Sequence, residues 1–236
     1  MLLFVLALFI TPLVAGAQGE EDLRRTVETL ATTSSRVSGY PGTEQARSWL
    51  LAELAGMGLN QIYRHAFPVS VPIDEGFELE YGAESLKLFG VWPNLVRTSS
   101  LPAGGVEAPL VDGGDGRLLE GQQVAGRIVL LDYDSGSACF DAFHLGAVAV
   151  VLLESVGAHR KEAEQKFLDV PADLPRFYAR SREAIRLRAL AAEGAEVRLS
   201  GRMVWREVQE QNIVVVIEGA DPVLQKEAVF LAAHYD

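Results

Sequence analysis

Residues 227–236 combine an apolar run with two polar residues at its end. Successive side chains of a strand point to opposite faces, so Phe230, Ala232, His234 and Asp236 share one face. Both faces are apolar until the end, which is typical of a strand buried between helices in a parallel or mixed sheet. We therefore predict a buried strand that brings its polar residues to the carboxyl end, where open α/β sheets place their ligand sites.

We predict an α/β fold, and the remaining pattern contains both helices and strands. Helical spacing of apolar residues predicts helices over residues 20–30, 43–57, 139–145 and 182–193, with Thr43 as the N-cap of the second. Short apolar runs bounded by Gly, Pro and Asp predict strands over residues 77–81, 84–88, 108–111, 126–132, 146–153, 196–204 and 212–217, and extended segments over residues 61–71 and 174–178. The strand over residues 212–217 is expected to pair in antiparallel fashion with residues 228–233 and to begin a new sheet.

The amino-terminal residues differ from the rest of the chain. Residues 1–14 carry no charged side chain, and Ala15-Gly-Ala17 has the A-x-A pattern of a cleavage site. The apolar run is shorter than the about 20 residues that a bilayer span needs. We therefore predict a signal peptide over residues 1–17, a secreted or periplasmic protein and no stable membrane association after cleavage; an uncleaved anchor is the alternative.

Composition narrows the range of partners. Hydrophobic residues make up 49% of the chain and charged residues 22%, which is typical of a globular protein. The formal net charge of -11 opposes binding to nucleic acid and to anionic membrane surfaces. Cys139 is the single cysteine of the sequence, so the chain has no internal disulfide and no Cys-x-x-Cys metal motif.

His234 and Asp236 are the candidate metal ligands. A neutral imidazole and a carboxylate are both accepted by zinc, and a carboxylate can bridge two ions. The alternative for His234 is a histidine at a strand end that is bonded to a neighbouring carbonyl group. His65, His144 and His159 lie in three separate segments without the spacing of a ligand set, so we interpret them as structural or surface residues.

Three segments resemble a known family. Residues 212–222 (Asn-Ile-Val-Val-Val-Ile-Glu-Gly-Ala-Asp-Pro) and 228–236 (Ala-Val-Phe-Leu-Ala-Ala-His-Tyr-Asp) resemble the start of the catalytic domain of co-catalytic zinc exopeptidases. These enzymes are the bacterial and vacuolar aminopeptidases related to glutamate carboxypeptidase II and the transferrin receptor. Residues 36–43 (Arg-Val-Ser-Gly-Tyr-Pro-Gly-Thr) resemble the amino-terminal segment of that family. Residues 101–204 resemble an inserted protease-associated domain, on the segments 109–114, 124–131, 146–152 and 174–175.

The resemblance implies a domain organisation. The signal peptide would be followed by an amino-terminal helical segment of the peptidase domain over residues 18–76. Residues 77–208 would contain the inserted α+β protease-associated domain. Residues 209–236 would begin the catalytic three-layer αβα domain, of which the chain carries the amino-terminal helices and the first two strands.

The resemblance also implies a chemistry. His234 would ligate one zinc ion and Asp236 would bridge two, whereas the other ligands and the catalytic glutamate of the family lie beyond the position of Asp236. The complete enzyme would be a zinc-dependent aminopeptidase that hydrolyses peptide substrates, and the present fragment is expected to be inactive alone. The alternative is a non-catalytic, secreted protein-interaction module built on the protease-associated domain.

Overall fold

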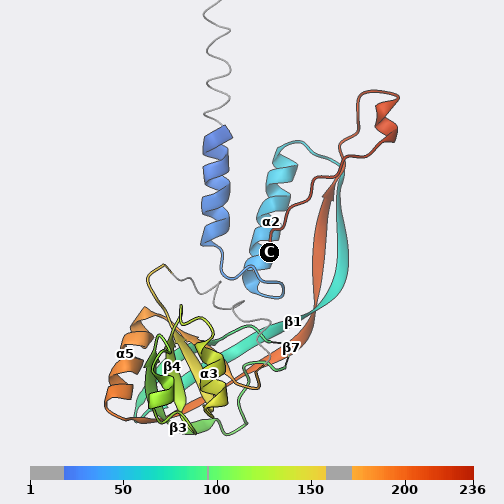
Figure 1. Cartoon of the computed structure of the whole chain (residues 1–236). Helices are drawn as coiled ribbons and strands as arrows, with labels where there is room; N and C mark the ends of the chain where they lie inside the picture. Colours follow the sequence, from blue (N-terminus) through green and yellow to red (C-terminus); the bar gives the residue numbers. More distant parts are fainter. Residues whose placement is uncertain (1–18, 95, 158–171) are drawn as a thin grey trace, which may run out of the picture. The chain divides into compact units, whose positions relative to one another are not determined.

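The computed structural model describes residues 19–94, 96–157 and 172–236 (Figure 1). The predicted signal peptide, residues 1–17, and His159 lie outside these ranges. Within the described part, no helix is both long enough and apolar enough to span a membrane. The chain divides into two compact units, which we describe separately: a first unit of residues up to 69 together with residues 208–236, and a second unit of residues 70–207.

The second unit is built on a mixed sheet. Its strands are β2 (Glu84–Gly90), β3 (Val106–Gly114), β4 (Ile128–Asp132), β5 (Ala149–Leu153) and β6 (Arg176–Ala179), with parts of the two long strands β1 (Ile62–Tyr81) and β7 (Glu196–Val215). The strand order is β1-β2-β6-β5-β4-β3-β7, and β7 returns to β1. Strands β3 to β6 run parallel, whereas β1–β2, β2–β6 and β3–β7 are antiparallel pairs. Strands β4 and β5 each have parallel neighbours on both sides, which explains why their sequences are almost continuously apolar.

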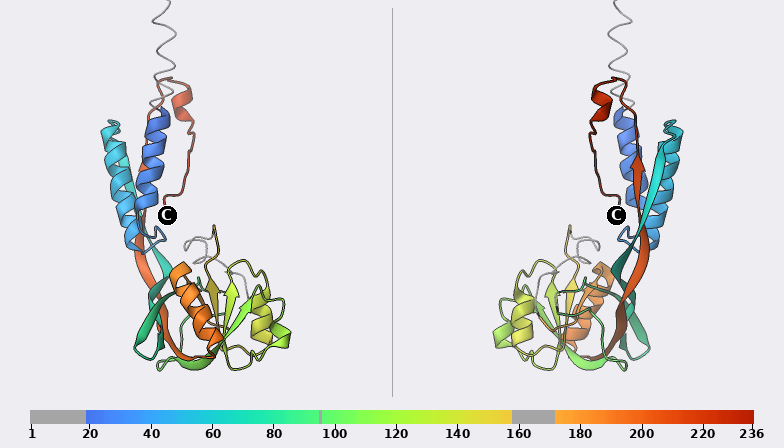
Figure 2. Two further views of the ribbon diagram at one scale, coloured as in Figure 1. Left: turned by 90° about the vertical axis from the view of Figure 1, so that its left-hand side faces the viewer. Right: turned by 90° about the vertical axis from the view of Figure 1, so that its right-hand side faces the viewer.

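Two apolar clusters cover the two faces of this sheet. Side chains of β4 alternate between them, with Ile128 and Leu130 in one cluster and Val129 and Leu131 in the other. The first cluster includes the buried residues of helix α5 (Ser181–Ala192), and the second those of helix α3 (Ala138–His144). Figure 2 shows these two helices on opposite sides of the parallel strands. The second unit therefore has a core of its own on each face.

Glu154 joins three elements of the second unit. It follows β5 and accepts hydrogen bonds from the Tyr178 hydroxyl of β6, at 2.5 Å, and from the backbone N–H of Ser181 at the start of α5, at 2.8 Å. The Ser181 hydroxyl donates to it as well. Burial alone would raise the pKa of Glu154, but the hydrogen bonds from Ser181 and Tyr178 hold it below its ordinary value of 4.5.

This lowered pKa predicts a stability that depends on pH. The unfolded chain binds the proton of Glu154 more tightly than the folded chain, so the stabilisation is complete above pH 4.5 and is lost as the pH falls through the lower folded value. We expect Glu154→Gln to lower the free energy of unfolding by about 1–2 kcal/mol at pH 7 and to flatten its decline below pH 4.5. Urea denaturation between pH 3 and 7 measures both, with the exposed Glu120→Gln as the control. An unchanged decline in Glu154→Gln would contradict the assignment.

The first unit combines two helices with the outer parts of the long strands. Helix α2 (Pro41–Gly56) follows a helix whose described part covers residues 19–32. After β7 the chain passes through the short 3-10 helix η2 (Leu224–Lys226) and continues without regular structure to Asp236. The Asp221 carboxylate accepts hydrogen bonds from the N–H groups of Val223 and Leu224, which lower the pKa of Asp221 and fix this turn.

Most predicted elements are confirmed, and the structure corrects three of their boundaries. The predicted helices over residues 43–57, 139–145 and 182–193 correspond to α2, α3 and α5. Helix α2 begins at Pro41, so Thr43 is not its N-cap; proline is suited to the first helical position because its fixed φ is already helical. The predicted strands over residues 196–204 and 212–217 belong to one strand, β7, because pairing with its neighbours continues through the mostly polar residues between them. The predicted extended segment over residues 61–71 and the predicted strand over residues 77–81 likewise belong to one strand, β1.

Candidate functional site

The candidate site is the terminal segment of the first unit, residues 227–236. The His234 Nδ1 atom lies 3.3 Å from an Asp236 carboxylate oxygen. The two side chains are 95% and 47% exposed, so both can accept a further ligand from solvent. In the part of the chain that the structure describes, no group of three or more His, Cys, Asp and Glu side chains is arranged to hold a metal ion. His234 and Asp236 therefore stay predicted ligands that the structure brings together as a pair.

The strand predicted to carry this pair does not form. Residues 228–236 belong to no strand, and Val229, Phe230 and Leu231 are 90% or more exposed. The predicted antiparallel pair is therefore wrong: residues 212–215 continue β7 instead, and the N–H of Val216 donates to the Gln61 carbonyl oxygen just before β1 at 3.0 Å. A strand that is apolar on both faces is stable when other elements pack against both faces. No element that the structure describes buries the apolar side chains of residues 229–231.

Tyr235, between the two predicted ligands, connects the terminal segment to the rest of the first unit. Its hydroxyl donates to the Gln211 carbonyl oxygen of β7 at 2.5 Å and accepts a hydrogen bond from Nε of Arg47 at 3.3 Å. Figure 1 shows the end of the chain returning to α2, the helix that carries Arg47. The site is thus held by its middle residue.

Arg47 and Glu210 are site residues that the sequence analysis did not single out. Both are buried, and the Arg47 guanidinium donates to the Glu210 carboxylate at 2.5 Å. Burial would lower the pKa of Arg47, but Tyr235, Glu210 and Glu44 hold it above its ordinary value, so the guanidinium stays charged. Arg47 follows Thr43 by four positions on the buried stripe of α2, and a charged residue on such a stripe is the signal that identifies it.

The segment that resembles the amino-terminal motif packs against the same pair. The Gly39 N–H donates to Glu210 at 2.9 Å, and the Thr43 hydroxyl lies within 2.8 Å of the carbonyl oxygens of Arg36 and Val37. Any Cβ atom on Gly42 would lie 2.3 Å from two backbone oxygens of the preceding loop. The motif therefore closes a tight loop onto the start of α2 and beside Glu210.

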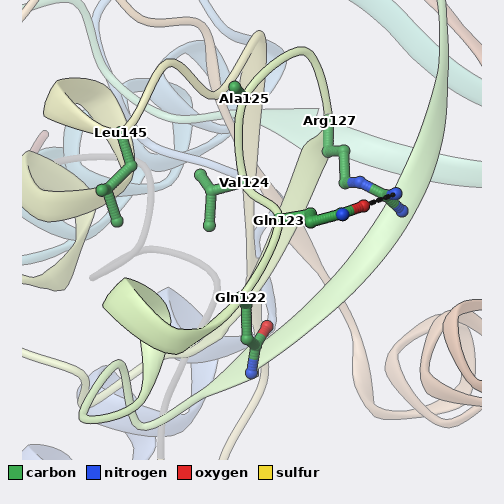
Figure 3. A pocket seen from close by; sticks show the side chains of 6 residues that line it. All are labelled: Gln122, Gln123, Val124, Ala125, Arg127 and Leu145. Carbon is green, nitrogen blue, oxygen red and sulfur yellow. Dashed lines mark hydrogen bonds between the residues drawn. The ribbon is translucent and has the colours of Figure 1, made fainter.

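Two cavities are lined by residues that the structure describes, one in each unit. The cavity of the first unit, about 1080 Å³, is lined by Phe67, by the end of β7 from Glu210 onward and by the terminal segment that includes His234 and Asp236. The cavity of the second unit, about 350 Å³, is drawn in Figure 3 and lined by Gln122, Gln123, Val124, Ala125, Arg127 and Leu145. Its one charged side chain, Arg127, donates to Gln123 at 3.1 Å. Of these two cavities, the larger one includes the candidate metal ligands.

The other histidines that the structure describes, His65 and His144, are distant in sequence from His234 and Asp236, and each contacts an aromatic ring. His65, on β1, stacks on Phe67 with ring centroids 6.1 Å apart. His144, at the end of α3, contacts the edge of Phe143 at 5.4 Å. Neither belongs to a metal-binding group within the described residues.

Comparison with known proteins gives similarity in structure only. No protein-family model and no curated protein sequence matches the chain. The Peptidase M28 precursor of Shewanella amazonensis matches with a TM-score of 0.55 and 17% identity, over 83% of this chain and 50% of that one. The zinc aminopeptidase BSAP of Bacillus subtilis matches with a TM-score of 0.55 and 16% identity, over 84% and 47%. The chain thus spans about half the length of these structures, and its mixed α/β fold resembles that part of M28 peptidase structures.

Proposed function

We propose that this chain is the amino-terminal part of a secreted, zinc-dependent exopeptidase of the aminopeptidase type. In this proposal His234 would ligate one zinc ion and Asp236 would bridge two. The observation that carries it is the His234–Asp236 pair, held 3.3 Å apart in a chain whose fold resembles half of a zinc aminopeptidase. The proposed organisation is a signal peptide (residues 1–17), an amino-terminal peptidase segment (18–76), a region with a protease-associated domain (77–208) and the start of the catalytic domain (209–236).

The two side chains fit zinc in their chemistry, because a neutral imidazole nitrogen and a carboxylate are both ligands that zinc accepts, and the structure brings them within 3.3 Å of each other. A catalytic zinc takes about three protein ligands and an open position, so the proposal assigns the missing ligands and the catalytic glutamate to residues outside this sequence. When bound, zinc supplies the Lewis acidity that polarises a peptide carbonyl group.

The chain's own residues have a binding and orienting role in this proposal. The imidazole of His234 offers a neutral nitrogen, and the Asp236 carboxylate offers two oxygens and a negative charge. The cavity of about 1080 Å³ beside them would receive the amino-terminal end of a peptide, the proposed substrate. Its lining from Glu218 and Glu227 contributes negative charge, which attracts the free α-amino group of such a substrate.

The test is zinc-dependent hydrolysis by the product of the complete reading frame. We expect this product to release the amine from aminoacyl-anilides, to lose activity with a chelator and to regain it with zinc. Residues 18–236 alone should show no turnover, because a positioned base and further ligands are needed. Turnover by residues 18–236 alone would contradict the assignment of the missing ligands. An inactive, metal-free product of the complete frame would favour the alternative, a non-catalytic protein-interaction module.

A further inference from the structure

We propose that Arg47 and Glu210 are positioning residues for the His234–Asp236 pair, and that they act through the hydroxyl group of Tyr235. The inference rests on the proposed role of that pair as zinc ligands. It assigns a function to a buried ion pair that neither the sequence motifs nor the proposed chemistry requires.

Hydrogen bonds connect Arg47, Glu210 and Tyr235 into one cluster. Arg47 donates to three groups: Glu44 at 2.5 Å, Glu210 at 2.5 Å and the Tyr235 hydroxyl at 3.3 Å. That hydroxyl has one hydrogen, which it donates to the Gln211 carbonyl oxygen. The Tyr235 oxygen is thus fixed from one side by α2 and from the other by β7.

Tyr235 is the point at which the terminal segment is attached. Within the described residues, the hydrogen bonds that connect residues 228–236 to other elements are those of the Tyr235 side chain. The apolar residues of the same segment are largely exposed and contribute little attachment. His234 and Asp236 are the immediate neighbours of Tyr235 in the chain, and their side chains contact each other at 3.3 Å, so the attachment of Tyr235 fixes the backbone on both sides of the pair.

The burial of the ion pair indicates that it determines placement more than stability. Arg47 and Glu210 are 7% and 5% exposed. Taking two charges out of water costs free energy that their attraction often only offsets, so a buried pair is weak evidence for stability. The guanidinium, however, is rigid and can hold three acceptors in fixed directions. In this cluster two of its acceptors are the carboxylate of β7 and the hydroxyl of the terminal segment.

The first test measures the order of the segment without any metal. In the 236-residue chain we expect backbone order parameters for His234 and Tyr235 near the rigid value of about 0.85, and values below about 0.6 in Tyr235→Phe. Tyr63→Phe, the same change on an exposed tyrosine of β1, should leave them unchanged. Glu210→Gln should lower them as Tyr235→Phe does, whereas Glu53→Gln, which removes the carboxylate of the exposed Arg25–Glu53 pair, should not.

The second test connects this order to the metal. In the product of the complete reading frame, Tyr235→Phe should weaken zinc binding by about 10- to 100-fold in competition with a chelator, and Tyr63→Phe should not. Unchanged order parameters in both Tyr235→Phe and Glu210→Gln would overturn the inference, as would unchanged zinc affinity in Tyr235→Phe. A wild-type product that binds no zinc would instead overturn the proposed function, and with it the positioning of zinc ligands, even where the order parameters fall.

Discussion

Replacing His234 by alanine in the product of the complete reading frame is expected to lower kcat/KM for aminoacyl-anilides by about 10³-fold or more. The reason is the loss of one of about three protein ligands that a catalytic zinc needs. The stabilisation of the transition state by the metal amounts to several kcal/mol, and about 4 kcal/mol corresponds to about 10³ in rate. The measurement is steady-state kinetics together with the zinc content of the purified protein.

His65→Ala is the matched control for this substitution. His65 is also an exposed histidine of the first unit, but it lies on β1, where its ring stacks on Phe67. We expect kcat/KM and zinc content to stay at the wild-type level in this variant. If His234→Ala were as active as His65→Ala, the assignment of His234 as a zinc ligand would be wrong.

Gly42→Ala is expected to destabilise the first unit by about 3 kcal/mol, at the upper end of the range for overpacking. The added Cβ would lie 2.3 Å from the carbonyl oxygens of Ser34 and Ser35, and these backbone atoms cannot rotate away as a side chain can. The loop would have to move away from α2, and with it the Gly39 N–H that binds Glu210. Urea denaturation measures the loss in free energy of unfolding, and hydrogen exchange of the α2 amides shows whether the loss is located in the first unit.

Gly56→Ala provides the control within the same helix. A Cβ at Gly56 meets nothing within 4 Å, and Gly56 is not among the glycines with positive φ. Alanine is the better helix former, so this change should stabilise the helix by about 0.5 kcal/mol. Equal effects of the two substitutions would show that the loop does not pack against α2 as described.

The sequence predicted the second unit well because its signals are local. The apolar run that forms β5 is buried along its whole length, and the apolar spacing over residues 182–193 belongs to α5. Such patterns determine element type without reference to distant residues. The length of β7 was not predictable in this way, because residues 205–211 are mostly polar, apart from Trp205 and Val208, and are extended through pairing with other strands.

The candidate site was predictable only in part. The contact between His234 and Asp236 could be anticipated because only one residue separates them in the sequence, whereas their role as zinc ligands stays a prediction. The pairing of Arg47 with Glu210 joins positions 163 residues apart, and no local pattern connects them. The prediction of a strand over residues 228–233 was wrong. A hydrophobic run indicates that a segment is stable when buried, but it does not indicate which element would pack against it, and these residues are exposed.

The most direct test of the account is anomalous diffraction at the zinc edge from crystals of the product of the complete reading frame. The account predicts two zinc peaks, one about 2.0–2.1 Å from a ring nitrogen of His234, with the Asp236 carboxylate contacting both. Zinc bound entirely by other residues, with His234 and Asp236 free of metal in an active protein, would contradict it.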